Sequence, residues 1–294
     1  MYTSPLVALL TDYGTADAFT GILKGVLAQI APGLPFADLT HEIPPGDIQR
    51  AAILLWQARP YFPTGTVFLC VIDPGVGTDR RGLVVESAGQ FFVGPDNGIF
   101  TFVLQDLFHA WELSNPDLAL PNPSLTFHGR DIFAPAAAHL ALGSRAHQFG
   151  PPVKDPARLP LPRLEFLPPD AIQGEIMTID RFGNLLTSLG KFERLPGGLI
   201  EFNPWLEGLA AVQMPPGMRS LFPFKAQNST LEIPGGVRLS WASNFAEIPD
   251  EHCAVLLGST GLLEIAANRR SATGLLDLRS GEAVTLRIQG EHHV

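Results

Sequence analysis

A carboxylate and a guanidinium, Asp73 and Arg80, lie within one short segment, VIDPGVGTDRR (residues 71–81). Asp73 directly follows Thr66–Ile72, an apolar run that is typical of a buried strand. In α/β proteins the carboxyl ends of such strands hold the ligand site. The Pro-Gly-x-Gly turn between the two charged residues permits positive φ and lets a ligand approach the backbone closely. The segment therefore predicts a loop that holds charged groups around a small ligand, with a loop-stabilising salt bridge as the simpler alternative.

Two further clusters of polar residues interrupt the first half of the chain. Asp12 and Asp17 lie in TDYGTAD (11–17), directly after the apolar run VALL. One carboxylate can accept hydrogen bonds from two neighbouring hydroxyls, so we favour a role such as holding a ribose diol for Asp12, whereas for Asp17 a cap of the following helix is an equal alternative. His128, in TFHGRD (126–131), resembles an ordinary loop histidine when taken alone. Beside an aspartate and an arginine it becomes a candidate for proton handling near neutral pH.

The second half contains a fourth cluster, made of turns that carry aromatic residues. It comprises DRFGN (180–184), Asn244-Phe245 and GSTG (258–261). Turn chemistry explains the glycines and asparagines. It explains Phe182 and Phe245 poorly, because exposed aromatic rings usually stack on another group. A planar heterocycle is the ligand that would suit them.

The order of the expected elements predicts two domains. In the first half, apolar runs alternate with helical stripes, which predicts an α/β domain with a mostly parallel sheet covered by helices over residues 1–150. Residues 151–170 contain seven prolines and read as an extended linker. Residues 171–294 show short β-like runs between turns, typical of a smaller β-barrel or sandwich. One expected helix carries a stripe that should face the core: Phe19, Ile22, Leu23, Val26, Leu27 and Ile30.

Composition excludes several classes of function. The net charge is −9 and no basic cluster is present, so nucleic-acid binding has little electrostatic support. The two cysteines, Cys70 and Cys253, lie in apolar runs and are expected to be buried and reduced. The chain shows no signal peptide and no apolar run long enough to span a membrane, so we expect a cytoplasmic protein. HExxH, P-loop, GxSxG and GxGxxG motifs are missing, and we expect no metal and no cofactor.

Several long strings in this chain resemble one family in the same order. They are LTDYGTAD, THEIPPGDI, VIDPGVGTDRR, GPDNGIF, TFHGRDIFAP, IDRFGNLLTS and GSTGLLEIAAN. The chain is similar to the SAM hydroxide adenosyltransferases, the adenosine-forming S-adenosyl-L-methionine (SAM) hydrolases, which are relatives of fluorinases and chlorinases. The resemblance implies an N-terminal α/β domain, a C-terminal β-barrel and a homotrimer. It also implies that the ligand lies between the N-terminal domain of one subunit and the C-terminal domain of its neighbour.

The resemblance also implies roles for individual residues. The water-activating set of the family falls on Asp73, Arg80 and His128. Its ribose-binding aspartate falls on Asp12, and its methionine-side aspartate on Asp17. In the second domain the matching ligand residues are Asp180, Phe182, Asn184, Phe245 and Ser259. Adenine recognition in the family uses backbone groups, here near Ala267 to Arg269.

Departures from the family pattern favour its hydrolase branch. Halogenating relatives carry Tyr, Thr and Ser where this chain has Asp73, Val76 and Gly129, and they carry an extra loop with no counterpart between residues 90 and 117. Gly46 stands in place of a ribose-stacking Trp. Thr260 stands in place of a carboxylate-binding Arg, which leaves the contact with the methionine carboxylate open. The expected reaction is attack of an activated water on the ribose C5′ of SAM, giving adenosine and L-methionine.

Two other functions remain open on the sequence alone. A metal-dependent hydrolase would use Asp12, Asp73, His41 and His128 as ligands. A non-catalytic module would bind adenosine or SAM without turnover, although binding alone does not require a set that polarises water. Which member of the Asp73, Arg80 and His128 set finally holds the proton is also left open.

Overall fold

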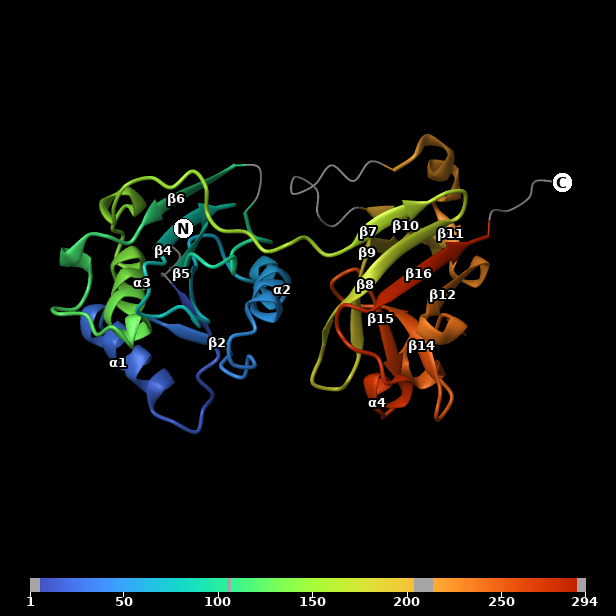
Figure 1. The fold of residues 1–294 in the computed structure, drawn as a ribbon, viewed down its shortest axis with the longest axis horizontal. Coiled ribbons are helices and arrows are strands. Elements are labelled where there is room, and N and C mark those ends of the chain that lie inside the picture. The colour runs from blue at the N-terminus through green and yellow to red at the C-terminus, as the bar shows by residue number, and fades with distance from the viewer. Residues whose placement is uncertain (1–5, 105–106, 204–213, 290–294) are drawn as a thin grey trace. The chain divides into compact units, whose positions relative to one another are not determined.

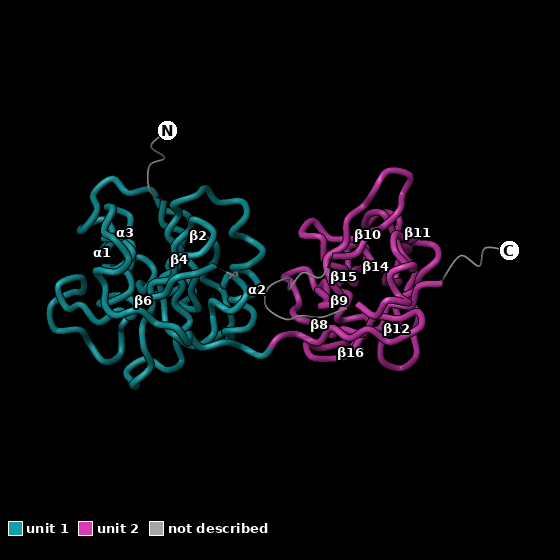
Figure 2. Tube along the Cα trace, turned by 90° about the horizontal axis from the view of Figure 1, so that it is seen from above, with its two compact units in different colours: residues 1–160 teal, residues 161–294 magenta. Residues whose placement is uncertain are grey.

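The computed structural model describes residues 6–104, 107–203 and 214–289. The chain divides into two compact units, residues 1–160 and 161–294 (Figure 2). Within the proline-rich stretch, Val153 is buried in the first unit and Pro152 forms a bridge to Trp111. Residues 164–167 form a strand of the second unit. Both ends of this stretch are therefore packed into a unit.

The first unit is an α/β domain, as predicted, and Figure 1 shows its sheet between helices. Its elements are β1 (Val7–Thr11), α1 (Phe19–Ile30), β2 (Phe36–Thr40), α2 (Ile48–Ala58), β3 (Val67–Val71), β4 (Gly82–Ser87), β5 (Gln90–Pro95), β6 (Phe108–Glu112) and α3 (Ala134–Ala141). The strand order is β2-β1-β3-β5-β4-β6. The pairs β1–β2, β1–β3 and β3–β5 are parallel.

The sheet is mostly parallel, as expected, and is mixed only because β4 runs against its other strands. Strand β4 runs antiparallel to both β5 and β6. The physical reason is the two-residue connection between β4 and β5. Ala88 and Gly89 both have positive φ, at 51° and 73°, which is the geometry of a tight hairpin turn.

Helices cover both faces of this sheet, α1 and α3 on one face and α2 on the other (Figure 1). The central strands are buried on both faces, so alternate residues feed two cores. In β1, Val7 and Leu9 pack with α1 and α3, whereas Ala8 and Leu10 pack with α2. Asp47 caps α2 by accepting a hydrogen bond from the Arg50 amide at 3.0 Å.

The predicted core stripe of α1 is only partly right. Leu23, Val26 and Leu27 are buried. Phe19 and Ile22 are 45% and 37% exposed. The reason is that the first turn of α1 does not pack on the sheet, and Phe19 instead contacts other aromatic rings at the edge of a pocket.

The second unit is built from antiparallel strands, as expected for a β-rich domain. Its elements are β7 (Leu164–Leu167), β8 (Ala171–Ile179), β9 (Leu185–Arg194), β10 (Leu199–Asn203), β11 (Phe224–Lys225), β12 (Ser229–Ile233), β13 (Val237–Leu239), β14 (Cys253–Leu257), β15 (Leu262–Ala267), α4 (Ala272–Leu276) and β16 (Ala283–Ile288). The main path is β11-β10-β9-β8-β16-β12-β13, and β15 joins β14 to β9. Closure into a barrel stays a prediction.

Two general expectations can be compared with the fold. Cys70 and Cys253 are both free, and Cys70 is fully buried whereas Cys253 is half-buried. Burial raises the pKa of both thiols. Among the helices of the described residues, none is both long and apolar enough to cross a membrane.

Candidate active site

The loop after β3 returns the chain on itself so that Arg80 faces Asp73. Its turns are closed by backbone bonds from the Val76 amide to the Asp73 carbonyl at 3.2 Å and from the Thr78 amide to the Gly75 carbonyl at 3.1 Å. Gly77 has a φ of +80°, and a side chain there would overlap the Leu125 carbonyl. The glycine is therefore required twice, by its backbone conformation and by the close approach of a second loop.

Arg80 holds Asp73 and His128 together. Arg80 Nε donates to Asp73 Oδ1 at 2.9 Å, and Arg80 Nη2 donates to Asp73 Oδ2. The same Nη2 lies 2.7 Å from His128 Nδ1. The Asp73 and Arg80 side chains are only 6% and 12% exposed, and the guanidinium also lies over the Phe133 ring, 5.1 Å from its centroid. The bidentate ion pair is therefore buried and rigid.

His128 is neutral in this arrangement. Burial lowers its pKa, and the positive charge of Arg80 lowers it further. His128 is the residue before a short π-helical turn, Gly129–Phe133, which leads into α3. The predicted set of three residues thus comes together from two segments far apart in the sequence.

The loops after the neighbouring strands β1 and β2 meet the loop after β3. Asp12 follows β1, and its Oδ2 accepts a hydrogen bond from the Gly46 amide at 2.9 Å. Gly46 lies in the loop after β2, has a φ of +75° and approaches Pro74. Since β2, β1 and β3 are adjacent and parallel, their carboxyl ends meet at one edge of the sheet, and this is where α/β folds bind ligands.

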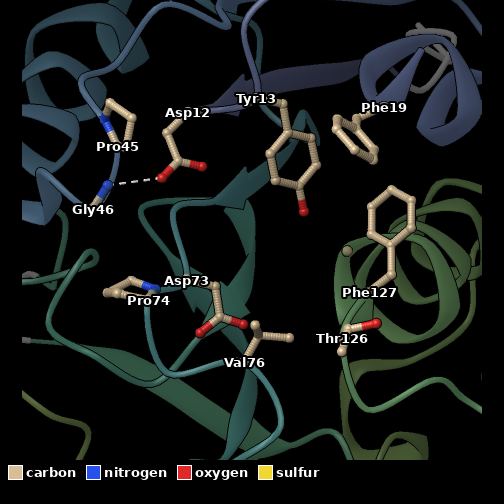
Figure 3. A pocket seen from close by; sticks show the side chains of 11 residues that line it. Asp12, Tyr13, Phe19, Pro45, Gly46, Asp73, Pro74, Val76, Thr126 and Phe127 are labelled. Carbon is tan, nitrogen blue, oxygen red and sulfur yellow. Dashed lines mark hydrogen bonds between the residues drawn. The ribbon is translucent and has the colours of Figure 1, made fainter. Parts of the chain in front are cut away.

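A pocket of about 630 Å³ opens at this edge (Figure 3). Its lining consists of Asp12, Tyr13, Phe19, Pro45, Gly46, Asp73, Pro74, Val76, Thr126, Phe127 and Gly129. Two carboxylates therefore stand in a largely apolar wall. Such a pocket suits an organic ligand that carries hydroxyl groups or a positive charge. Arg80 is bonded to Asp73 and also contacts His128, and neither Arg80 nor His128 lines the pocket.

Three aromatic residues of this wall were not predicted as site residues. Tyr13, Phe19 and Phe127 form an edge-to-face cluster with centroid separations of 5.5–5.9 Å. Tyr13 directly follows Asp12, and Phe127 directly precedes His128, so both lie inside polar motifs that the sequence had indicated. Their position next to predicted site residues is the sequence feature that could have identified them. Asp17, by contrast, is exposed and lies outside the pocket lining.

In the second unit, the turn between β8 and β9 is organised by Asp180. Its Oδ1 accepts hydrogen bonds from the amides of Phe182 at 2.8 Å and Asn184 at 2.9 Å, and its Oδ2 accepts from Asn184 Nδ2 at 2.8 Å. Asn184 is buried, whereas Phe182 is 78% exposed. Gly183 has a φ of +84° and packs against Ser271, with no room for a side chain. The turn thus presents one aromatic ring to the outside.

Phe245 and Ser259 lie on two other turns of the second unit. Phe245 begins a short 3-10 helix that Asn244 caps, and it is 47% exposed. Ser259 lies in the turn between β14 and β15. Near it, Glu264 lies close to Gly258, and its pKa is raised by burial and then by the negative charge of Asp180. The negative charge of Asp180 therefore acts on Glu264, which lies beside the turn that carries Ser259.

The four candidate metal ligands do not gather around one point. His41 Nδ1 bonds Thr11 Oγ1 at 2.9 Å, and its Nε2 lies 3.2 Å from Asp38 Oδ1. Asp73 and His128 Nδ1 face the Arg80 guanidinium, whose charge would repel a cation. Within the described ranges, no group of three or more His, Cys, Asp or Glu side chains has an arrangement that could hold a metal ion.

Comparison with known proteins relates this fold and pocket to one family. Residues 7–150 match the model of the SAM hydroxide adenosyltransferase N-terminal domain, and residues 217–285 match that of the C-terminal domain. A protein of Thermus thermophilus named (R)-S-adenosyl-L-methionine hydrolase is 41% identical over 293 residues, which covers 95% of this chain and 98% of that protein. The chain belongs to the SAM hydroxide adenosyltransferase family.

Two further matches are more distant in sequence. A fluorinase of Actinopolyspora mzabensis is 26% identical, with coverage of 96% of this chain and 97% of that enzyme. A crystal structure of an uncharacterized conserved protein from Thermotoga maritima superposes with a TM-score of 0.79 at 30% identity, covering 96% of this chain and 99% of that one. Along nearly the same length, the chain is therefore more similar to this hydrolase than to this fluorinase.

Proposed function

We propose that this protein hydrolyses S-adenosyl-L-methionine to adenosine and L-methionine. The relative named as a hydrolase is 41% identical, against 26% for a fluorinase compared over a similar length. Asp73, Val76 and Gly129 are the residues at which we expect the chain to differ from halogenating relatives, and all three line the pocket. The proposal therefore takes water rather than halide as the nucleophile.

The observation that carries the proposal is a carboxylate on the pocket wall with a guanidinium bonded behind it. Both oxygens of Asp73 accept from Arg80, and each oxygen keeps a further lone pair for a water in the pocket. The water oxygen forms a bond to C5′ as the C5′–S bond breaks, and the electron pair of that bond goes to sulfur. Methionine leaves as a neutral thioether, so the leaving group needs no general acid.

Positioning accounts for the catalysis in this scheme. A water held in line with the C–S bond reacts as part of a unimolecular step, which can lower the barrier by roughly 7–11 kcal/mol at the upper end. Asp73 accepts one hydrogen of the water and the proton leaves through this carboxylate, while Arg80 holds Asp73 and His128 in place. Because Arg80 has no acceptor, it orients the two other groups and stays charged.

The remaining assignments belong to the same proposal. Asp12 binds the ribose hydroxyls and Asp17 the methionine side, both from the α/β catalytic domain of residues 1–150. Asp180, Phe182, Asn184, Phe245 and Ser259 contribute from the β domain of residues 171–294, which closes into a barrel. Adenine is bound by backbone groups near residues 267–269. The active assembly is a homotrimer in which a neighbouring subunit supplies these second-domain residues.

The experiment that tests the function is incubation of the purified protein with SAM in ¹⁸O-labelled water, with products read by mass spectrometry. We expect labelled adenosine and unlabelled methionine. Adenine, methylthioadenosine or S-adenosylhomocysteine as the main product would exclude this reaction. Adenosine binding without any product would indicate a binding module instead. An arm with a chelator should give the same rate, and a lost rate would indicate a metal-dependent enzyme.

Two variants of the same loop localise the reaction. Asp73→Ala should lower turnover by a factor of about 10²–10⁴, the range for loss of a general base, with a much smaller effect on adenosine binding. Asp79→Ala is the matched control, because Asp79 lies in the same loop, is exposed and does not line the pocket. Equal losses of turnover and adenosine affinity in the Asp73 variant would contradict its assigned role.

A further inference from the structure

Tyr13 directs a hydroxyl into the pocket from the loop that carries Asp12. Figure 3 shows this hydroxyl turned toward the interior of the pocket, on the side of Asp73. Its ring is held edge-to-face by Phe19 and Phe127, at centroid distances of 5.9 Å and 5.8 Å. The Tyr13 amide also donates to Thr11 Oγ1 at 3.3 Å. Both the backbone and the ring are therefore fixed, so the position of the hydroxyl is determined by packing.

Gly129 provides the space that this hydroxyl occupies. A Cβ at position 129 would overlap Tyr13 Oη and would also lie 3.3 Å from Val71 Cγ1. Gly129 does not have positive φ, so its backbone conformation does not require glycine. It is buried at the start of the π-helical turn, directly after His128. The absence of a side chain at this position is thus explained by the hydroxyl group of Tyr13.

The electrostatic surroundings keep this hydroxyl protonated. Burial raises the pKa of Tyr13, and the negative charges of Asp12 and then Asp73 raise it further, while Arg80 opposes them weakly. Asp12 and Asp73 can only accept hydrogen bonds when ionised. Among the described residues, none forms a hydrogen bond with Tyr13 Oη in this structure. The hydroxyl is therefore a neutral polar group that faces the pocket.

We propose that Tyr13 is a further catalytic residue, whose hydroxyl hydrogen-bonds the attacking water opposite Asp73. This inference rests on the proposed hydrolysis of SAM. A water bonded only to Asp73 can rotate about that bond, whereas a second partner fixes the direction of the lone pair that attacks C5′. Tyr13 keeps its proton throughout, and the proton of the water leaves through Asp73. Gly129 is then the residue that makes room for this second partner.

Tyr13→Phe tests the proposal because it removes only the oxygen and keeps the ring packing. We expect kcat to fall about tenfold, as for one lost hydrogen bond, with KM and the Kd for adenosine changed less than twofold. An unchanged kcat, or a rise in KM with constant kcat, would overturn the proposal. The wild-type protein is assayed first. If it forms no adenosine from SAM, the proposed function has failed, whereas an active wild type with an equally active variant refutes only the role of Tyr13.

A double-mutant cycle with Gly129→Ala tests the contact between the two residues. With Tyr13 present, the new methyl group overlaps the hydroxyl, and we expect kcat to fall at least a hundredfold. In the Tyr13→Phe background the nearest ring carbon is 3.4 Å away, so the same change should cost less than tenfold. Equal losses in both backgrounds would refute the contact. Gly25→Ala is the control, since this glycine of α1 has open space around it, and circular dichroism verifies that each variant is folded.

Discussion

Arg80 Nη2 lies 2.7 Å from His128 Nδ1, and this contact determines the tautomer of the histidine. A guanidinium has five N–H donors and no acceptor, so His128 Nδ1 must be the unprotonated nitrogen. The proton of the neutral ring is therefore on Nε2. Protonation of Nδ1 would place two positive groups at hydrogen-bond distance and break the contact. The neutral ring is thus part of the arrangement that holds Asp73.

This relationship predicts that activity is lost at acidic pH. Burial and the charge of Arg80 hold the pKa of His128 below the ordinary histidine value of about 6.5. At neutral pH the ring is unprotonated, and kcat/KM should fall on acidification with a midpoint below pH ~6.5. In the same window the unfolded chain binds more protons than the folded one, so stability also decreases as pH falls.

The measurement is a pH profile of kcat/KM for the wild type and for His128→Asn. The amide oxygen of Asn can accept from Arg80 but does not titrate, so this variant should lack the acid limb of the profile. If the acid limb of the profile persists unchanged in His128→Asn, the loss of activity at low pH is caused by another titrating group. A wild-type midpoint clearly above 6.5 would contradict the direction of the shift.

Arg80→Lys should lower turnover although it preserves the charge. Arg80 contacts both oxygens of Asp73 and also His128, whereas an ammonium is a single point charge that cannot bridge all three atoms. We expect kcat to fall by about 10- to 100-fold. The matched control is Arg81→Lys, because Arg81 instead pairs with Asp96 and Asp155. Steady-state kinetics that show equal activity for both variants would argue against a bridging role of Arg80.

Some of this site could be predicted from local sequence. Asp12 and Asp73 each follow a buried apolar run, and parallel neighbouring strands bring their carboxyl ends together. The sequence therefore predicts the proximity of these two loops. The position of His128 could not be derived in the same way, since it depends on how the segment before α3 crosses the sheet edge. Only the family resemblance placed it beside Asp73.

Residues whose role depends on long-range packing were missed. Phe19 continues the apolar stripe of α1, so the helical spacing of apolar residues predicts that it is buried. That spacing cannot show that the first turn of the helix is exposed. Tyr13 was not predicted as a site residue, because its significance depends on its packing against Gly129, which is distant in the sequence. The antiparallel β4 was also unforeseen, although its direction follows from the short turn at Ala88 and Gly89.

Gly77→Ala should destabilise the first unit and reduce activity. The position requires a φ of +80°, and the new methyl group would overlap the Leu125 carbonyl. The change therefore pushes the loop of Asp73 away from the segment that leads to His128. We expect the free energy of unfolding to fall by about 2 kcal/mol or more.

Gly65→Ala is a control that separates the backbone strain of a positive φ from the steric overlap with the Leu125 carbonyl. Gly65 has nearly the same φ, +84°, but open space around it, and it lies at the other end of β3. We expect it to cost only about 1 kcal/mol and to leave kcat unchanged. Urea unfolding and steady-state kinetics check both variants. Equal destabilisation by the two changes would show that the contact with Leu125 contributes nothing.

Asp180→Asn should alter both the stability of the second unit and the titration of Glu264. The carboxylate accepts three hydrogen bonds within its turn, and an amide cannot accept from Asn184 Nδ2 with its own NH₂ group. Because Asn184 is buried, its unpaired amide should cost about 1–3 kcal/mol.

The same substitution removes a negative charge near Glu264. The pKa of Glu264 should therefore decrease, yet stay above the ordinary value, since burial is the larger cause of its rise. Carbon-13 NMR of the Glu264 carboxyl group follows this titration, and Asp250→Asn, at an exposed site of the same unit, is the control. An unchanged pKa in the Asp180 variant would mean that the two carboxylates are not coupled. The Asp180 turn and the turn that carries Ser259 would then be electrostatically independent of each other.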